Sequence, residues 1–156
     1  MKKTNAIREL ETHKIEHIVR EYEVDEAHLD ALSVAIKTNE DITRIFKTLV
    51  LLNEKKEMIV ACIPGLEKLD LKKLAKISGS KKVEMLPMKD LFSMTGYLRG
   101  GCSPIAIKKR HTAFIHNSAT DNETILISGG LRGLQIEISP QKLIDYLNLI
   151  VADIIE

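Results

Sequence analysis

Two short glycine-rich segments hold six of the eight glycines of this chain, residues 96–104 (Gly-Tyr-Leu-Arg-Gly-Gly-Cys-Ser-Pro) and residues 128–133 (Ser-Gly-Gly-Leu-Arg-Gly). Glycine is favoured where the backbone must adopt a positive φ or must come very close to another group. Two such loops in a small protein predict one pocket walled by main chain, whose N–H groups could bind a carbonyl, a carboxylate or a phosphate. Two tight turns are the alternative, but the Ser-Pro after the first glycine pair and the Arg after the second favour a site.

Lys47 is the next residue whose type and position indicate chemistry. It stands in the run 45–52 (Ile-Phe-Lys-Thr-Leu-Val-Leu-Leu), where a period of two places it in one row with Ile45, Leu49 and Leu51. An inward lysine on an edge strand, where it prevents aggregation or reaches out to water, is one explanation. The other is a cation held in an apolar cleft, where it binds a phosphate or a developing oxyanion more strongly than it would in water.

Length and composition predict one compact domain over residues 1–156, because 156 residues with 44% hydrophobic composition suffice for a full core. The net charge of +1 excludes binding of nucleic acid through bulk charge, so a polyanion would have to be met locally. Two cysteines are too few for a disulfide framework, and the start at Met1 shows no apolar leader, so we expect a cytoplasmic protein. No apolar run approaches the roughly 20 residues that span a bilayer, so we expect no membrane contact.

Helix and strand signals alternate without a regular strand–helix–strand rhythm, which predicts an α/β fold with a mixed, barrel-like sheet surrounded by helices. Thr4, Asp70 and Ser139 stand at positions typical of N-caps, and the apolar stripe after Ser139 predicts a helix that continues as far as Ile154. Further helices are expected around 29–36 and 87–94, and Gly79 is expected to end the helix that starts at Asp70. Strands are predicted at 15–22, 42–52, 58–63, 83–86, 105–107, 112–116, 124–128 and 134–138.

The order of several motifs along the chain resembles the YbaK/EbsC family, whose members are freestanding aminoacyl-tRNA deacylases similar to the editing insertion domain of bacterial prolyl-tRNA synthetase. The motifs are Lys3-Thr4-Asn5-Ala6, Phe46-Lys47-Thr48-Leu49, the segment 69–75, Gly96-Tyr97 before 100–104, Lys108-Lys109-Arg110, and Ser128-Gly129-Gly130 before 132–134. This resemblance implies an editing function, because a synthetase pocket rejects cysteine in place of proline only by a modest factor. It also implies that the substrate is Cys-tRNA(Pro), whose own thiol attacks the ester carbonyl, with no cofactor and no protein nucleophile.

The resemblance further implies roles for individual residues. Lys47 matches a lysine needed for activity that holds the acceptor end of the tRNA, and Gly100 and Gly101 match a loop that presents N–H groups to the carbonyl. The remaining residues expected to bind substrate are Tyr22, Gly96, Ser103, Ser128, Gly129, Gly130, Arg132 and Gln135.

Two positions depart from the family pattern. Gln135 stands where the family commonly has Asp, so it can still accept a hydrogen bond but lacks the charge. A pocket phenylalanine is replaced, by Leu29 or Leu32, so the amino-acid preference is less firmly implied than the deacylase class. The implied partners are the 3′ acceptor end of tRNA(Pro) and, transiently, prolyl-tRNA synthetase.

Three other interpretations stay open at this point. Cys102 could be a nucleophile, but no histidine is adjacent in sequence to activate it. The five histidines show no metal-site spacing beyond His13 and His17 at i, i+4, and that pair spans the expected end of the first helix. The basic run 108–111 fits either a tRNA phosphate contact or a solvated turn. The alternatives to a Cys-tRNA(Pro) deacylase are an editor of Ala-tRNA(Pro) that uses a bound water, and a catalytically silent module that binds aminoacyl-tRNA or the synthetase.

Overall fold

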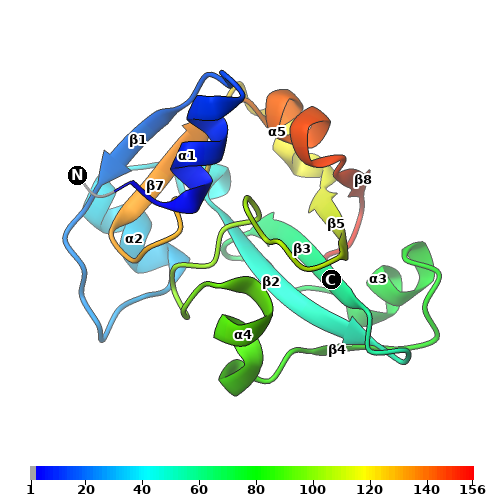
Figure 1. Cartoon of the computed structure of the whole chain (residues 1–156). Helices are drawn as coiled ribbons and strands as arrows, with labels where there is room; N and C mark the ends of the chain where they lie inside the picture. Colours follow the sequence, from blue (N-terminus) through cyan, green and yellow to red (C-terminus); the bar gives the residue numbers. More distant parts are fainter. Residues whose placement is uncertain (1–2) are drawn as a thin grey trace.

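Eight strands in two sheets form the centre of the computed structural model, which describes residues 3–156 (Figure 1). The start at Met1 and Lys2, where no leader was expected, lies outside these residues. The smaller sheet is antiparallel, in the order β1-β7-β6, and consists of β1 (Ile18–Glu21), β6 (Ile125–Ser128) and β7 (Leu134–Ile138). The larger sheet has the order β4-β2-β3-β5-β8 and consists of β2 (Phe46–Asn53), β3 (Met58–Pro64), β4 (Val83–Met85), β5 (His111–His116) and β8 (Ile150–Ala152).

The larger sheet is mixed, because β4, β2 and β3 are antiparallel neighbours whereas β5 and β8 continue in parallel. The predicted α/β class with a mixed sheet is therefore confirmed. The strands are divided between two sheets, which a parallel bridge between Ile45 and Leu126 connects, where a single barrel-like sheet was expected.

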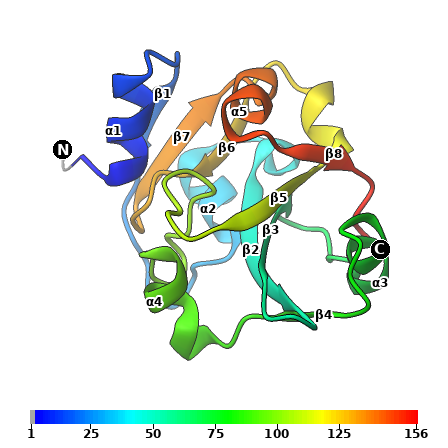
Figure 2. The same cartoon turned by 45° about the vertical axis from the view of Figure 1, so that its right-hand side comes forward.

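Within residues 3–156, five α-helices and three short 3₁₀ helices surround the sheets (Figures 1 and 2). Thr4, Asp30, Asp70 and Ser139 each accept a hydrogen bond at the start of a helix, so the three N-caps expected from the sequence are confirmed. Both views show α1 alongside β1 and β7, and α3 near β4. The helices are α1 (Asn5–Thr12), α2 (Ala31–Thr38), α3 (Leu71–Ile77), α4 (Leu91–Thr95), α5 (Pro140–Leu147), η1 (Ile42–Arg44), η2 (Met88–Asp90) and η3 (Asn117–Asp121).

Two predicted elements are wrong. The final helix stops at Leu147 because Asn148 adopts the left-handed conformation with φ 54°, and the apolar residues that follow form β8 instead. No strand forms at 105–107, because Ala106 has φ 66° and cannot extend a strand. That segment is buried as an irregular loop, and the hydroxyl of Ser103 accepts a hydrogen bond from the N–H of Ile105.

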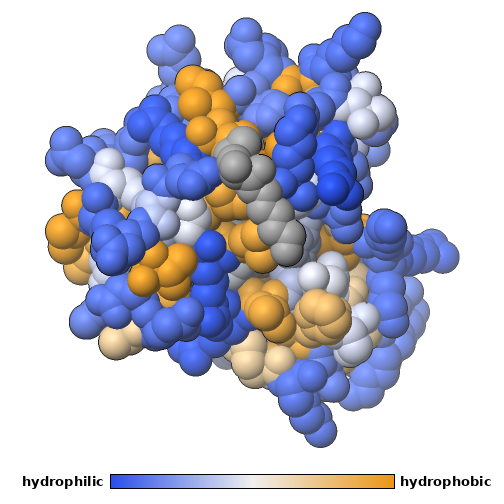
Figure 3. All heavy atoms as spheres, turned by 60° about the vertical axis from the view of Figure 1, so that its left-hand side comes forward, coloured by the Kyte–Doolittle hydropathy of each residue, from blue (hydrophilic) through white to orange (hydrophobic). Residues whose placement is uncertain are grey.

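The main core lies between the two sheets and continues under α1 and α5, and a second core lies between the larger sheet and α3. The alternation of β3 separates them, since Val60 and Cys62 face the main core whereas Ile59, Ala61 and Ile63 face the second. The face shown in Figure 3 is largely hydrophilic, with apolar side chains in separate patches. Among residues 3–156, no helix combines the length and the apolar character needed to cross a bilayer.

Candidate functional site

A cavity of about 180 Å³, here called the inner cavity, lies where the two sheets meet beneath α2. It brings together residues from β1–α2, β2, β6, β7 and the first glycine-rich loop. Its lining is Tyr22, Leu29, Ala31, Val34, Ile45, Phe46, Lys47, Thr48, Gly100, Cys102, Leu126, Ile127, Ser128, Leu134 and Gln135. Five of the residues expected at the site on sequence grounds thus share one cavity: Tyr22, Lys47, Gly100, Ser128 and Gln135.

Strand β7 supplies the polar part of the lining through its alternation. Leu134, Ile136 and Ile138 join the main core, which turns Gln135 to the opposite face of the sheet. Ser128 of β6 is the direct cross-strand partner of Gln135, so both side chains lie on that face. Gln135 is only 4% exposed, and its Oε1 atom has no hydrogen-bond partner among residues 3–156. A buried acceptor without a partner is costly, so this oxygen is suited to receive a donor from a ligand.

Glu137 is the next residue on the polar face of β7, and its side chain binds residues from several elements around the cavity. Its Oε2 accepts hydrogen bonds from Thr124 Oγ1 at 2.6 Å and from Arg44 Nη2 at 3.0 Å, and its Oε1 lies 2.5 Å from Arg20 Nη2. Both arginines also pair with Glu40, just beyond α2. The hydrogen bond from Thr124 and the two arginines hold the pKa of Glu137 below its usual value, so this carboxylate is charged at neutral pH.

The roof of the inner cavity comes from α2 and from the turn before it. Ala31 and Val34 of α2 line the cavity together with Leu29. Gly65 leaves no room for a side chain, because a Cβ there would overlap the Cβ of Ala31, and this allows α2 to approach the end of β3. Of the two candidates for the missing phenylalanine, Leu29 lines the cavity and Leu32 is 48% exposed outside it.

Lys47 enters the cavity from the part of β2 that has a neighbour on one side only. It pairs with Ile63 of β3, whereas the pairing with β4 starts at Leu51. Leu49 and Leu51, in the same row, pack into the second core, as the alternation predicted. Partial burial lowers the pKa of Lys47, and the nearby Glu67 opposes this shift. The surroundings of Lys47 therefore have features of both explanations given for it. The lysine stands at an open strand edge, and it also lines an apolar cavity.

The first glycine-rich loop contacts the cavity through Gly100, which has φ 83°. Gly101 does not line the cavity, and its φ is not in the positive region. Its N–H donates to the carbonyl of Leu98 at 2.9 Å, so this N–H is occupied, contrary to the expectation that it faces a substrate carbonyl. A Cβ at Gly101 would lie 3.2 Å from backbone atoms of Leu131 and Arg132, so this glycine allows the two glycine-rich loops to touch.

The second glycine-rich loop joins β6 to β7, and most of it lies outside the lining of the inner cavity. The N–H of Gly129 donates to the carbonyl of Leu134, and the N–H of Gly130 donates to the hydroxyl of Ser128. Gly130 packs against Tyr97 and Thr4. Arg132 binds the carbonyl of Arg99 at 2.6 Å and pairs with Glu26 at 2.6 Å, so it connects the loops near the cavity.

Gly96 and Ser103, both expected to bind substrate, take structural positions in the first loop. Gly96 ends α4 in the left-handed conformation with φ 84°. Ser103 is fully buried and holds the N–H of Ile105, whose carbonyl accepts a hydrogen bond from the Tyr97 hydroxyl. Substrate contacts by Gly96, Ser103, Gly129, Gly130 and Arg132 stay predictions.

Cys102 also lines the inner cavity. Burial raises the pKa of its thiol to about 11, and burial raises the pKa of Cys62, behind it, to about 12. A thiol with such a pKa is almost wholly protonated near neutrality and is a poor nucleophile. Thr48, for which the motif 46–49 gave no individual role, also lines the cavity and contacts Cys62 Sγ at 3.9 Å.

A second hollow of about 500 Å³, here called the outer cavity, adjoins the inner one. The two share Leu29, Lys47, Thr48, Gly100 and Cys102. From Lys47 the outer cavity follows β2 to Val50 and then reaches Met85, Leu86 and Met88. Within residues 3–156, no group of three or more His, Cys, Asp or Glu side chains is arranged to hold a metal ion.

Comparisons with known proteins show the family to which this chain belongs. The aminoacyl-tRNA editing domain model matches residues 25–146. EbsC of Enterococcus faecalis, provisionally named a Cys-tRNA(Pro)/Cys-tRNA(Cys) deacylase, is 49% identical over 146 residues, which cover 94% of this chain and 89% of EbsC.

Two solved structures share the fold. One is a hypothetical protein, APE2540, with TM-score 0.88, 19% identity, and coverage of 96% of this chain and 97% of that one. The other is provisionally described as a trans-editing enzyme for prolyl-tRNA synthetase, with TM-score 0.82, 20% identity, and 99% of both chains covered. The chain belongs to the aminoacyl-tRNA editing domain family.

Proposed function

We propose that residues 1–156 form one editing domain that deacylates Cys-tRNA(Pro), and also Cys-tRNA(Cys), in trans in the cytoplasm. The observation that carries the proposal is the inner cavity, which combines a cation at its mouth with a buried, unpartnered amide oxygen inside. The match to the editing-domain model and the 49% identity to EbsC support the same class of substrate. Prolyl-tRNA synthetase, the source of the mischarged tRNA, is proposed as a transient partner.

The cavity suits the ester end of an aminoacyl-tRNA in both charge and size. Lys47, where the inner and outer cavities meet, would hold the phosphate or the ester oxygen of the terminal nucleotide. Gln135 Oε1 would accept a hydrogen bond from the α-amino group or from a ribose hydroxyl. A volume of about 180 Å³ suits an amino-acid side chain, and Leu29, Ala31 and Val34 give the cavity an apolar roof.

The proposed chemistry uses the thiol of the substrate. The cysteine thiolate attacks its own ester carbonyl, a carbon–sulfur bond forms, and the bond from that carbonyl to the ribose oxygen breaks. The ribose oxygen takes up a proton, and the products are free tRNA and a cyclic thiolactone. Cys102 is unsuited to replace this nucleophile because its pKa is raised to about 11, whereas an ordinary cysteine thiol, with a pKa of about 8.5, is a few per cent thiolate at pH 7.

The test is a deacylation assay with Cys-, Ser-, Ala- and Pro-tRNA(Pro) in parallel, with detection of the thiolactone. We expect rapid turnover of Cys-tRNA(Pro) and poor turnover of Ser-tRNA(Pro), because a hydroxyl is hardly ionised. The enzyme-catalysed rate on Cys-tRNA(Pro), corrected for spontaneous hydrolysis, should rise several-fold between pH 7 and 8. Cys102→Ser should retain deacylation.

The same assay contains the outcomes that contradict the proposal. Equal turnover of Ser- and Cys-tRNA(Pro) would assign the nucleophile to a bound water. Release of free alanine from Ala-tRNA(Pro), without turnover of Cys-tRNA(Pro), would assign the protein to the alanyl type of editor. Binding of aminoacyl-tRNA without turnover of any substrate would leave a silent binding module.

A further inference from the structure

The outer cavity leads from the mouth of the inner cavity toward one end of the larger sheet. Its wall follows β2 from Lys47 to Val50 and continues on Met85 of β4. Strand β4 runs antiparallel to β2, so its first residue, Val83, lies beside Asn53 at the end of β2. A chain that left the inner cavity along this wall would therefore arrive at the β2–β3 turn.

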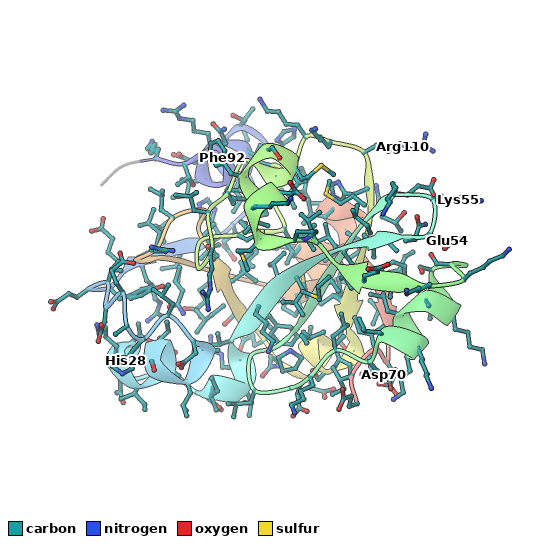
Figure 4. All side chains as sticks on the ribbon, turned by 90° about the horizontal axis from the view of Figure 1, so that it is seen from below. His28, Glu54, Lys55, Asp70, Phe92 and Arg110 are labelled. Carbon is teal, nitrogen blue, oxygen red and sulfur yellow. The ribbon has the colours of Figure 1, made fainter. Side chains whose placement is uncertain are left out.

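The topology gathers three basic segments at this end of the sheet. The β2–β3 turn carries Lys55 and Lys56, and the segment before β4 carries Lys81 and Lys82. The N–H of Lys81 donates to Glu54 Oε1 at 3.0 Å, which joins these two segments. The run 108–110 precedes β5, whose first residue, His111, pairs in parallel with Met58 directly after the turn. Figure 4 shows Arg110 and Lys55 at the same end of the molecule.

This basic end, defined as Lys55, Lys56, Lys81, Lys82, Lys108, Lys109 and Arg110, is exposed and concentrates positive charge. Segments 54–57, 81–84 and 108–111 hold seven lysines and arginines against three glutamates, whereas the rest of the chain holds 16 basic and 19 acidic residues. Among residues 3–156, Lys82 is the member of the basic end that forms an ion pair, with Glu84. The charge of the molecule is thus strongly asymmetric although its net value is only +1.

We propose that the basic end binds the phosphates of the tRNA acceptor arm while the ester occupies the inner cavity, an inference that rests on the proposed function. From Lys47 to Asn53 the strand extends about 20 Å at 3.3 Å per residue. At 3.4 Å per nucleotide of a stacked strand, this distance corresponds to about six nucleotides. The basic end therefore lies where the first pairs of the acceptor stem follow the unpaired 3′ end. Its positive charge complements the phosphates, and the outer cavity, which reaches Val50 and Met85, leads from the inner cavity toward it.

The experiment compares two triple variants on two substrates. Lys55→Gln/Lys109→Gln/Arg110→Gln removes three cations of the basic end, and Arg8→Gln/Lys14→Gln/Lys72→Gln removes three exposed cations elsewhere. The long substrate is Cys-tRNA(Pro), and the short one is the cysteinyl ester of adenosine, which has no upstream phosphates. For the first variant we expect KM on the long substrate to rise about ten-fold or more at unchanged kcat, with unchanged kinetics on the short substrate. The slope of log Kd for uncharged tRNA against log salt should fall by about 2 to 3, because each lost phosphate contact removes roughly 0.7 to 0.9.

Two results would overturn the inference. If both triple variants have the wild-type KM and the wild-type salt slope, the basic end does not contact the acceptor arm. If the first variant changes activity only when prolyl-tRNA synthetase is present, the basic end docks a protein instead. Failure of the proposed function is distinguishable, because it would appear as absent turnover of the short substrate by the wild-type protein, and the salt slope would still report tRNA binding.

Discussion

Lys47 and Gln135 reach the inner cavity from different sheets and with different electrostatic properties. Lys47 carries a charge that partial burial makes less favourable, whereas Gln135 is neutral and keeps a buried acceptor that has no partner within residues 3–156. Each arrangement costs the folded protein free energy unless a ligand compensates for it. Variants at these two positions should therefore separate activity from stability.

Lys47→Ala should abolish deacylation while the protein stays folded. Loss of a positioned cation typically costs on the order of 3 kcal/mol or more in the transition state, which is more than a hundred-fold in kcat/KM. Removal of a partly desolvated charge should cost little stability, and the direction of the pKa shift of Lys47 shows why. A lysine whose folded pKa is lowered disfavours the folded state fully below that pKa, and the penalty disappears only above the unfolded pKa, so the substitution relieves it at pH 7. The measurements are kcat/KM and the thermal midpoint, with Lys76→Ala on the exposed face of α3 as the control. A folded Lys47→Ala variant with wild-type activity would leave Lys47 as an ordinary edge-strand lysine.

Gln135→Leu should lower activity without lowering stability. Leucine removes the unpartnered oxygen at similar volume, so the free energy of unfolding should stay the same or increase by up to about 1 kcal/mol. Loss of an acceptor for the substrate should reduce kcat/KM by roughly ten-fold to a hundred-fold. Denaturant unfolding and deacylation kinetics measure the two effects, and Gln141→Leu on α5 is the control. Parallel losses of stability and activity would mean that Gln135 has only a structural role.

The sequence alone indicated a functional role for Lys47 more directly than for Gln135. Lys47 was conspicuous because a cation interrupts an apolar row, which depends on local alternation alone. Gln135 was noticed only as a departure from the family pattern. Its lack of a partner depends on which side chains β1 and β6 place beside it, and a single sequence does not contain that long-range information.

At the scale of elements, the structure changes the reason why the glycine-rich loops matter. They pack against each other at Gly101, so most of their glycines shape the loops, and Gly100 alone among the six lines the inner cavity. The glycine content predicted that the two loops lie close together. It did not predict which glycines line the cavity and which allow the loops to pack against each other. This division depends on the contact between Gly101 and the 131–132 backbone, two segments about 30 residues apart.

Gly101→Ala should reduce activity more than Gly79→Ala does. The added Cβ at Gly101 would lie 3.2 Å from backbone that cannot rotate away, so the loop that carries Gly100 must shift. Gly79 has φ 70° after the end of α3, and a Cβ there would meet no atom within 4 Å, so alanine should cost stability of about 1 kcal/mol through backbone strain alone. Thermal midpoints and kcat/KM measured on both variants separate the effects. Equal losses of activity that follow stability would make the first loop an ordinary turn.

Capped helix starts were the bounds easiest to predict, whereas the strand predicted at 42–52 begins only at Phe46, because residues 42–44 form η1. The Ser139-Pro140 start of α5 was found because capping is local. The end was missed because Ile150, Val151 and Ile154 fit a helical stripe, and pairing with β5 decides that the segment 150–152 forms β8. Tertiary contacts likewise keep the apolar segment 105–107 out of the sheet, since Ser103 and Tyr97 bind its backbone.

At the scale of the whole molecule, the network around Glu137 ties the smaller sheet to the segment that follows α2. Glu137 accepts hydrogen bonds from Thr124, Arg44 and Arg20, and the same arginines bind Glu40. Glu137 therefore connects β7, which lines the inner cavity through Gln135, to the segment after α2, the helix that forms the roof. The pKa of Glu137 is lowered, so the charged form of this carboxylate is favoured.

Glu137→Gln should destabilise the protein by about 1 to 3 kcal/mol at pH 7. Because the folded pKa is lowered, the carboxylate contributes stability above its ordinary pKa, and this contribution is lost as the pH falls through the folded value. The difference between wild type and variant should therefore shrink below about pH 4, near the ordinary pKa of a glutamate. Denaturant unfolding at pH 7 and at acidic pH tests this, with the exposed Glu123→Gln as the control. A difference that does not change with pH would show that the charge of Glu137 is not what stabilises the fold.

Residues 150–156 close the larger sheet and fasten α3, and this has a consequence for biosynthesis. β8 pairs with β5, Ile155 bridges to Leu69, and the N–H of Glu156 donates to the carbonyl of Lys68 at 2.9 Å. A ribosome delivers the chain from the N-terminus, so these contacts must wait until some 80 residues after α3 have been made. From the completion of β5 at His116 until β8 is made at Ile150, β5 has an unpaired edge, which is a template for pairing with another nascent chain. Slow translation of the last third of the message would lengthen this exposure, so yield in the cell should depend on elongation rate and on chaperones that shield β5.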